Sequence, residues 1–146
     1  MLGIVIVTHG TLSVGLKNAA EVIIGESNNI VTESLFEEDN IQELNKKIKQ
    51  AMESVDQGDG VIIFTDIESA SPYNQALIMV NQLDENKKQQ VVVISGVNLP
   101  MLLESINHQY LKTPIAHIPD NMIKQASMSF NYWSYKSETV NEEDDF

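Results

Sequence analysis

The stretch Ile4-Val5-Ile6-Val7-Thr8-His9-Gly10 decides the fold that this sequence predicts. Four consecutive apolar, β-branched residues favour a strand that is buried on both faces, as strands of parallel sheets are. A histidine and a glycine then stand where the strand ends and a helical pattern begins. Because ligands of open α/β sheets bind outside the carboxyl ends of the strands, His9 lies where a reactive imidazole is expected.

Strand-like and helix-like segments alternate along the rest of the chain. Two further apolar runs, at residues 61–64 and 91–94, predict buried strands, and residues 30–36 predict another strand. Residues 115–118 predict a short edge strand, and Ser71-Pro72 predicts a helix start with Ser71 as its cap. This alternation predicts an α/β fold, an open and mainly parallel four-stranded sheet with helices on both faces.

Composition limits the classes of function. The 146 residues are about one domain in length, which we assign to residues 1–130, followed by an acidic tail at 131–146 that we expect to be disordered. A net charge of −12 argues against nucleic-acid binding, which needs clustered cations. Without cysteine, and with three histidines that lack ligand spacing, no metal or other cofactor is expected. The chain shows no signal-peptide pattern and no apolar stretch of about 20 residues, so we expect a cytoplasmic protein.

Two polar residues follow their strands at the same offset. His9 and Asp66 each stand after four apolar residues and one threonine. On neighbouring parallel strands this offset brings an imidazole and a carboxylate together, and a carboxylate that accepts from one ring nitrogen leaves the other as a nucleophile. The helix start at Ser71 adds unpaired backbone N–H groups and a hydroxyl, which suit a phosphate. Together these residues predict phosphoryl transfer through a phosphohistidine.

Each of these residues also has a simpler interpretation. His9 could be a polar strand end, Asp66 a loop cap and Ser71 a helix cap. The remaining candidates are predicted to be structural: His108 at the surface or an interface, His117, and the apolar stripe of Met101, Leu102 and Ile106 in the core or a subunit interface.

Five motifs in order resemble the mannose-family IIA domain of the bacterial phosphotransferase system. They are Gly3 to Gly10, Lys17 to Gly25, Gly58 to Asp66, Ser71 to Asn74 and Gly96 to Glu104, within a resemblance that runs from residue 2 to about 118. The resemblance implies that His9 accepts a phosphoryl group from the phosphocarrier protein HPr and passes it to the IIB component. It implies that Asp66 orients the imidazole, so that phosphate attaches to the ring nitrogen away from the carboxylate. The membrane is then involved only indirectly, through the IIC/IID transporter.

The resemblance also implies further site residues and an assembly. Thr8, Gly10, Ser69 and Ser71 are assigned to phosphate binding. A homodimer is expected that exchanges an edge strand, Ile115 to Ile118. The segment Asn98, Leu99, Pro100 and Met101 would line the active-site rim near the partner subunit.

One loop departs from the family pattern. Most members carry an aromatic or aliphatic residue and two glycines before the Ser-Pro pair, where this chain has Glu68-Ser69-Ala70. Loss of the glycines removes left-handed backbone freedom and Glu68 adds a negative charge, so we expect a differently shaped phosphate loop. The string from Ser69 to Ala76 resembles the gluconate-type branch of the family.

Two other classes of function remain. A histidine phosphatase also uses a strand-end His-Gly pair, but it places arginine before the histidine, where this chain has Thr8 and no arginine anywhere. Ester hydrolysis without cationic groups around the phosphate is disfavoured. A non-transport regulatory module, phosphorylated on the same His9, stays open as the alternative.

Overall fold

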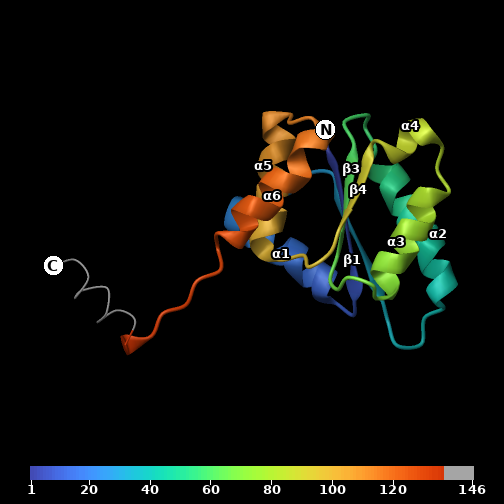
Figure 1. Cartoon of the computed structure of the whole chain (residues 1–146). Helices are drawn as coiled ribbons and strands as arrows, with labels where there is room; N and C mark the ends of the chain where they lie inside the picture. The colour runs from blue at the N-terminus through green and yellow to red at the C-terminus, as the bar shows by residue number, and fades with distance from the viewer. Residues whose placement is uncertain (137–146) are drawn as a thin grey trace.

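A parallel sheet lies between two layers of helices in the computed structural model of the chain, which describes residues 1–136 (Figure 1). The part of the predicted tail at 137–146 lies outside the described residues. The sheet order is β2-β1-β3-β4 and every neighbouring pair is parallel. The strands are β1 (Gly3–His9), β2 (Ile30–Leu35), β3 (Val61–Thr65) and β4 (Val91–Ile94). The predicted α/β class and four-stranded parallel sheet are confirmed.

The helices cover both faces of the sheet. They are α1 (Leu12–Ile24), α2 (Ile41–Val55), α3 (Ser71–Asn81), α4 (Glu85–Lys88), α5 (Leu99–Leu111) and α6 (Ile118–Ser127). Helices α1, α5 and α6 lie on one face, and α2, α3 and α4 lie on the other (Figure 1). Among residues 1–136, none of the helices is both long and apolar enough to span a membrane.

The apolar run of β1 serves both faces. Ile4 and Ile6 belong to the core under α1, α5 and α6, whereas Val5 and Val7 belong to the core under α2 and α3. Side chains of a strand alternate between its two faces, so a continuous apolar run is what a strand between two helical layers requires. The same run fixes His9 at the carboxyl end of the central part of the sheet.

The edge strand predicted at Ile115–Ile118 is wrong. Ile115–His117 forms a 3-10 turn, η1, and Ile118 begins α6. Ile115 and Ile118 are both buried in the same core, which three-residue spacing allows in a helical turn and not in a strand of period two. Pro114 and Pro119 flank the segment and have no N–H to give to a sheet. Within the described residues β4 is therefore an outer strand, and Ile115–Ile118 is not a strand that a dimer could exchange; the homodimer itself stays a prediction.

The helix start predicted at Ser71-Pro72 is right, although the predicted cap is not. Asn98 caps α5, because its side-chain oxygen accepts from the backbone N–H of Met101 at 2.9 Å. Ser71 is instead the first helical residue of α3, and the extended residue Ala70 stands at the cap position without a side-chain bond. Pro72 occupies the first turn, where its missing N–H costs nothing. The Ser71 hydroxyl is thus not used for capping.

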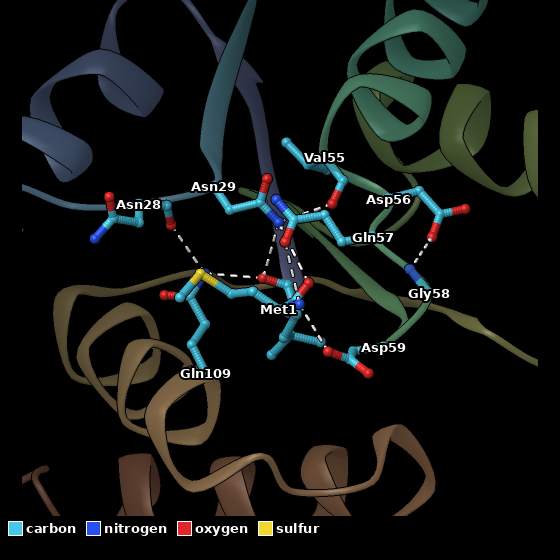
Figure 2. Close-up of polar contacts among 10 residues, drawn as sticks. Met1, Asn28, Asn29, Val55, Asp56, Gln57, Gly58, Asp59 and Gln109 are labelled. Carbon is cyan, nitrogen blue, oxygen red and sulfur yellow. Dashed lines mark hydrogen bonds and ion pairs between the residues drawn. The ribbon is translucent and has the colours of Figure 1, made fainter.

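A polar network fixes the end of the sheet opposite His9 (Figure 2). The buried side chain of Gln109 donates to the carbonyls of Leu2 at 2.9 Å and Asn28 at 3.0 Å. Asn29 donates to the carbonyl of Val55 at 2.8 Å, with longer contacts to the start of β1. These bonds link α5 to the segments that precede β1, β2 and β3. They also satisfy backbone carbonyls that the hydrogen bonds of the sheet leave unpaired. The amino end of the sheet is therefore a structural end.

Candidate active site

His9 and Asp66 meet at the carboxyl ends of β1 and β3. The sheet pairs Val7 with Thr65, so Asp66 comes level with Thr8 and one residue short of His9. The carboxylate spans this difference: Asp66 Oδ2 accepts from the backbone N–H of His9 at 2.9 Å and lies 2.7 Å from His9 Nδ1. The structure thus brings together the pair that the sequence offset indicated, but Asp66 stands opposite Thr8 in the strand register and not opposite His9.

This contact determines which ring nitrogen of His9 is free. A carboxylate only accepts hydrogen bonds, so Nδ1 carries the proton and Nε2 carries the lone pair. The His9 side chain is 47% exposed while that of Asp66 is 9% exposed. Within residues 1–136 no group hydrogen-bonds Nε2. The geometry therefore presents Nε2 to the solvent as a nucleophile of fixed orientation.

The carboxylate is held in its charged form. Burial by itself raises the pKa of Asp66, but the hydrogen bonds from the His9 backbone and ring, with the charge of that ring, act more strongly together. The pKa of Asp66 consequently lies below its usual value. The other carboxylate oxygen accepts from the backbone N–H of Ile67 at 3.0 Å, which also favours the ionised form.

Two predicted phosphate-binding residues hold the turn between β1 and α1. Thr8 is fully buried, and its hydroxyl oxygen accepts from the backbone N–H of Ser13 at 2.8 Å. Gly10 is left-handed with φ of 55°, and its N–H donates to the carbonyl of Leu35 at 2.9 Å. Since the Thr8 hydroxyl and the Gly10 N–H already have partners, the structure gives these groups to the turn and does not present them to His9 Nε2.

The other two predicted phosphate-binding residues lie on the loop that begins at Asp66. Ser69 has a φ of 64°, so the left-handed conformation is present although no glycine is. Its carbonyl accepts from Asn74 Nδ2 at 2.9 Å. In the described part of the chain, the hydroxyl and N–H of Ser71 have no hydrogen-bond partner. Ser69 and Ser71 therefore keep free polar groups near the His9–Asp66 pair.

The predicted rim segment follows β4 on the same side of the sheet. The backbone N–H of Gly96 donates to the Asp66 carbonyl at 3.1 Å, and that of Val97 to the Thr65 carbonyl at 3.0 Å. Asn98 and Leu99 are partly exposed and Pro100 is exposed, whereas Met101 is 5% exposed and packs in the core. Of the four residues, Met101 therefore does not face the solvent, and a role for the other three stays a prediction.

A hollow of about 430 Å³ lies directly beside His9. Phe36 and Ile41, exposed to 52% and 45%, give it an apolar surface, and Glu37 and Asp39 give it negative charge. None of its lining residues is lysine or arginine: they are His9, Gly10, Leu35, Phe36, Glu37, Asp39 and Ile41. The sequence analysis did not predict this surface, although an acidic loop with one apolar residue on each side, Phe36 and Ile41, is a recognisable signal.

The three histidines lie in three different elements and do not form one site. His108, predicted at the surface or an interface, is instead buried, with Nδ1 2.8 Å from the Thr113 hydroxyl and Nε2 3.5 Å from a Glu104 oxygen. The prediction failed because His108 faces inward at the last turn of α5. His117 is exposed in η1, and the stripe of Met101, Leu102 and Ile106 is core, as predicted. Within residues 1–136 no three histidine or acidic side chains are grouped to hold a metal ion.

Comparison with known proteins identifies the fold and the family. The family described as "PTS system fructose IIA component" matches residues 3–122. The chain is 30% identical to the fructose-specific EIIA component of Bacillus subtilis, over 96% of this chain and 92% of that protein. It is 32% identical to the mannose-specific EIIAB component of Escherichia coli, over 72% of this chain and 31% of that longer protein. A phosphotransferase EIIA component of Streptococcus agalactiae has the same fold, with a TM-score of 0.78 at 20% identity, covering 90% of this chain and 97% of that one.

The open parallel sheet is thus that of a phosphotransferase-system protein. The chain belongs to the mannose-family IIA components of the bacterial sugar phosphotransferase system, which transfer phosphoryl groups in sugar uptake. This confirms the resemblance on which the sequence interpretation rested. The relatives are named for different sugars, fructose and mannose, so they lend no support to the gluconate-type branch in particular.

Proposed function

We propose that His9 is the reversible phosphorylation site of this IIA component, accepting a phosphoryl group from phospho-HPr and passing it to the IIB component. The single observation that carries the proposal is the contact of 2.7 Å between Asp66 Oδ2 and His9 Nδ1. It fixes the tautomer and leaves Nε2 as the attacking atom. Asp66 is then the orienting residue, and Ser69 and Ser71 supply donors to the phosphate.

The transfer needs no group outside the two proteins. The Nε2 lone pair of His9 forms the new bond to phosphorus while the bond between phosphorus and the donor breaks, and that electron pair stays with the donor. The Nδ1 proton remains between His9 and Asp66. As Nε2 bonds phosphorus the ring gains positive charge, and the buried carboxylate of Asp66 offsets it. Onward transfer to IIB is the same step in reverse, with His9 as the leaving group.

The hollow beside His9 is the docking surface that we assign to the partner proteins. Its apolar residues Phe36 and Ile41 give burial, while Glu37 and Asp39 favour a partner with a basic rim. The chain has no arginine and carries a net charge of −12. Positive charge to stabilise the transferring phosphoryl group is therefore expected from the partner.

We extend the proposal to the assembly that family membership implies: a IIA domain that forms a homodimer and acts with a membrane transporter. We assign residues 1–130 to one cytoplasmic IIA domain that reaches the membrane indirectly, through the IIC/IID transporter. A homodimer is supported by the exposed apolar side chains of Val22 and Ile23 on α1, exposed to 79% and 58%. Sedimentation equilibrium tests it, and a monomer at micromolar concentration would remove this part.

The experiment that tests the proposal is phosphorylation in a defined mixture. The protein is incubated with phosphoenolpyruvate, enzyme I and HPr, and acid-labile phosphate is measured. His9→Ala should accept none, whereas His117→Ala, which removes another exposed histidine, should accept as much as the parent. Equal labelling of His9→Ala would overturn the proposal. Addition of IIB then separates a carrier, which loses its phosphate, from a regulatory module, which keeps it.

A further inference from the structure

We propose that Asn74 is a positioning residue for phosphoryl transfer, because its side chain holds the Ser69 carbonyl and so fixes the loop between Asp66 and Ser71. This inference rests on the proposed function of His9. Asn74 is not offered as a catalytic residue, because its side-chain amide donates to the Ser69 carbonyl. It acts through the backbone of Ser69.

The loop contains a turn with a residue in an unfavourable conformation. The N–H of Ala70 donates to the carbonyl of Ile67 at 3.4 Å, which closes a four-residue turn with Ser69 in its third position. Ser69 has a φ of 64° there. Turns with positive φ at this position favour glycine or asparagine, because a Cβ atom crowds the backbone in the left-handed region. Serine therefore needs a contact that holds it in this state.

Asn74 supplies that contact from a rigid element. Its Nδ2 donates to the Ser69 carbonyl at 2.9 Å, while its backbone N–H donates to the Ala70 carbonyl at 2.9 Å as the first helical bond of α3. The side chain thus reaches back from the helix to the residue before the helix cap. Asn74 on α3 therefore holds the carbonyls of two successive residues, Ser69 and Ala70.

The two halves of the loop are held by different groups. At its start, the Asp66 carbonyl accepts from Gly96 N–H at 3.1 Å and the Asp66 carboxylate accepts from Ile67 N–H at 3.0 Å. From Glu68 to Ala70, the Asn74 amide is the side chain that hydrogen-bonds the loop within residues 1–136. Loss of Asn74 should therefore release Ser69 while leaving the His9–Asp66 contact in place.

Release of Ser69 would move the groups assigned to the phosphate. A left-handed residue that relaxes to negative φ rotates its own N–H and the following peptide. The loop donors would then no longer be held at one position relative to His9 Nε2. A misplacement of about 1 Å can cost roughly a hundredfold in rate, and since this hydrogen bond is exposed we expect about tenfold.

The test is a double-mutant cycle on transfer from phospho-HPr. Asn74→Ala should lower kcat about tenfold in the parent chain, because the loop is no longer fixed. In a chain that carries Ser69→Gly, the same Asn74→Ala change should cost less than about twofold, because glycine adopts positive φ without support. A residue that merely stabilises α3 would cost the same in both backgrounds.

The matched control is Asn45→Ala. Asn45 Nδ2 donates to the Gln75 carbonyl at 3.2 Å, a bond of the same chemistry to the neighbouring residue of α3 but outside the loop. Its loss should leave kcat within about twofold. If Asn74→Ala keeps the parental kcat, or if its cost is unchanged in the Ser69→Gly background, the inference is wrong.

A second measurement separates this inference from the function on which it rests. If the parent protein accepts no phosphate at all, the proposed function fails by itself. Amide resonances of Ser69 and Ala70, with 15N relaxation, report the loop without any transfer. Asn74→Ala should shift these resonances and lower their order parameters, whereas Asn45→Ala should not. Unchanged resonances in Asn74→Ala would overturn the inference whatever the transfer assay shows.

Discussion

One carboxylate oxygen of Asp66, Oδ2, accepts hydrogen bonds from both the backbone and the ring of His9, at 2.9 and 2.7 Å. The backbone bond continues the pairing of β1 with β3 by one step past the last ladder pair, Val7 with Thr65. The ring bond selects the tautomer. Because the same oxygen makes both bonds, the position of the imidazole is coupled to the end of the sheet itself, and a rigid element holds the proposed nucleophile.

Asp66→Asn should slow phosphorylation of His9 while keeping the fold. An amide can place its NH₂ group toward Nδ1, which favours the wrong tautomer and leaves no charge to offset the phosphorylated ring. We expect a loss of about 10- to 100-fold, as for other groups that orient a histidine. The rate of acid-labile labelling from phospho-HPr measures it. Asp59→Asn, which removes a charge near the opposite end of the sheet, is the control and should label at the parental rate.

The same pair makes a prediction about stability and pH. The pKa of Asp66 is lower in the folded chain than the unfolded value of about 3.9, so its stabilising contribution is present above that value and is lost as the pH falls through the folded pKa. At neutral pH, Asp66→Asn should lower the free energy of unfolding by about 1–3 kcal/mol. Urea unfolding from pH 7 to pH 3 should show this difference shrinking below about pH 4. A difference that grows toward acid pH would contradict the assignment.

Gln109→Met should lower stability without altering transfer. The Gln109 side chain is 4% exposed and donates to the carbonyls of Leu2 and Asn28, which methionine cannot do. The Leu2 carbonyl would keep only its longer contact of 3.3 Å with Asn29 Nδ2, so the loss of both Gln109 bonds should cost about 1–3 kcal/mol of unfolding free energy. The exposed neighbour Asn107, changed to alanine, should cost less than about 1 kcal/mol. Urea unfolding measures both, and a labelling rate that falls in folded Gln109→Met would place this network in the function.

The sequence predicts the elements that a repeating hydrophobic pattern marks, but it does not predict features that depend on one particular contact in the folded chain. Continuous apolar runs at β1, β3 and β4 are read directly as buried strands, and His9 follows from its place after the first of them. The strand predicted at Ile115 to Ile118 is wrong because four mainly apolar residues are too few to show a period, so they fit a strand as well as a helical turn. The prolines on both sides decided between them, since neither can join a sheet ladder.

Contacts that depend on side-chain reach were also beyond sequence reasoning. The offset of His9 and Asp66 suggested the pair, but the register is shifted by one residue and the carboxylate makes up the difference. The loss of glycine at Ser69 suggested a reshaped loop, yet the left-handed conformation is present and Asn74 holds it. No sequence spacing predicts the hydrogen bond from Asn74 to the Ser69 carbonyl.

Phe36→Ala should weaken the binding of phospho-HPr and leave the chemical step intact. Phe36 lines the hollow beside His9 and is 52% exposed, so a partner can cover it. Its backbone hydrogen bonds are to Asp39 and not to the His9–Asp66 pair. An exposed aromatic side chain that a partner buries contributes about 1–3 kcal/mol, which predicts an increase in KM of roughly 5- to 100-fold with kcat near the parental value. Steady-state transfer at increasing phospho-HPr measures the two constants separately.

The control for Phe36→Ala is Ile123→Ala, which removes an apolar side chain of similar exposure, 50%, from α6. Both constants should stay unchanged in this variant. If Phe36→Ala lowers kcat at unchanged KM, the hollow serves the reacting groups and is not the surface on which the donor docks.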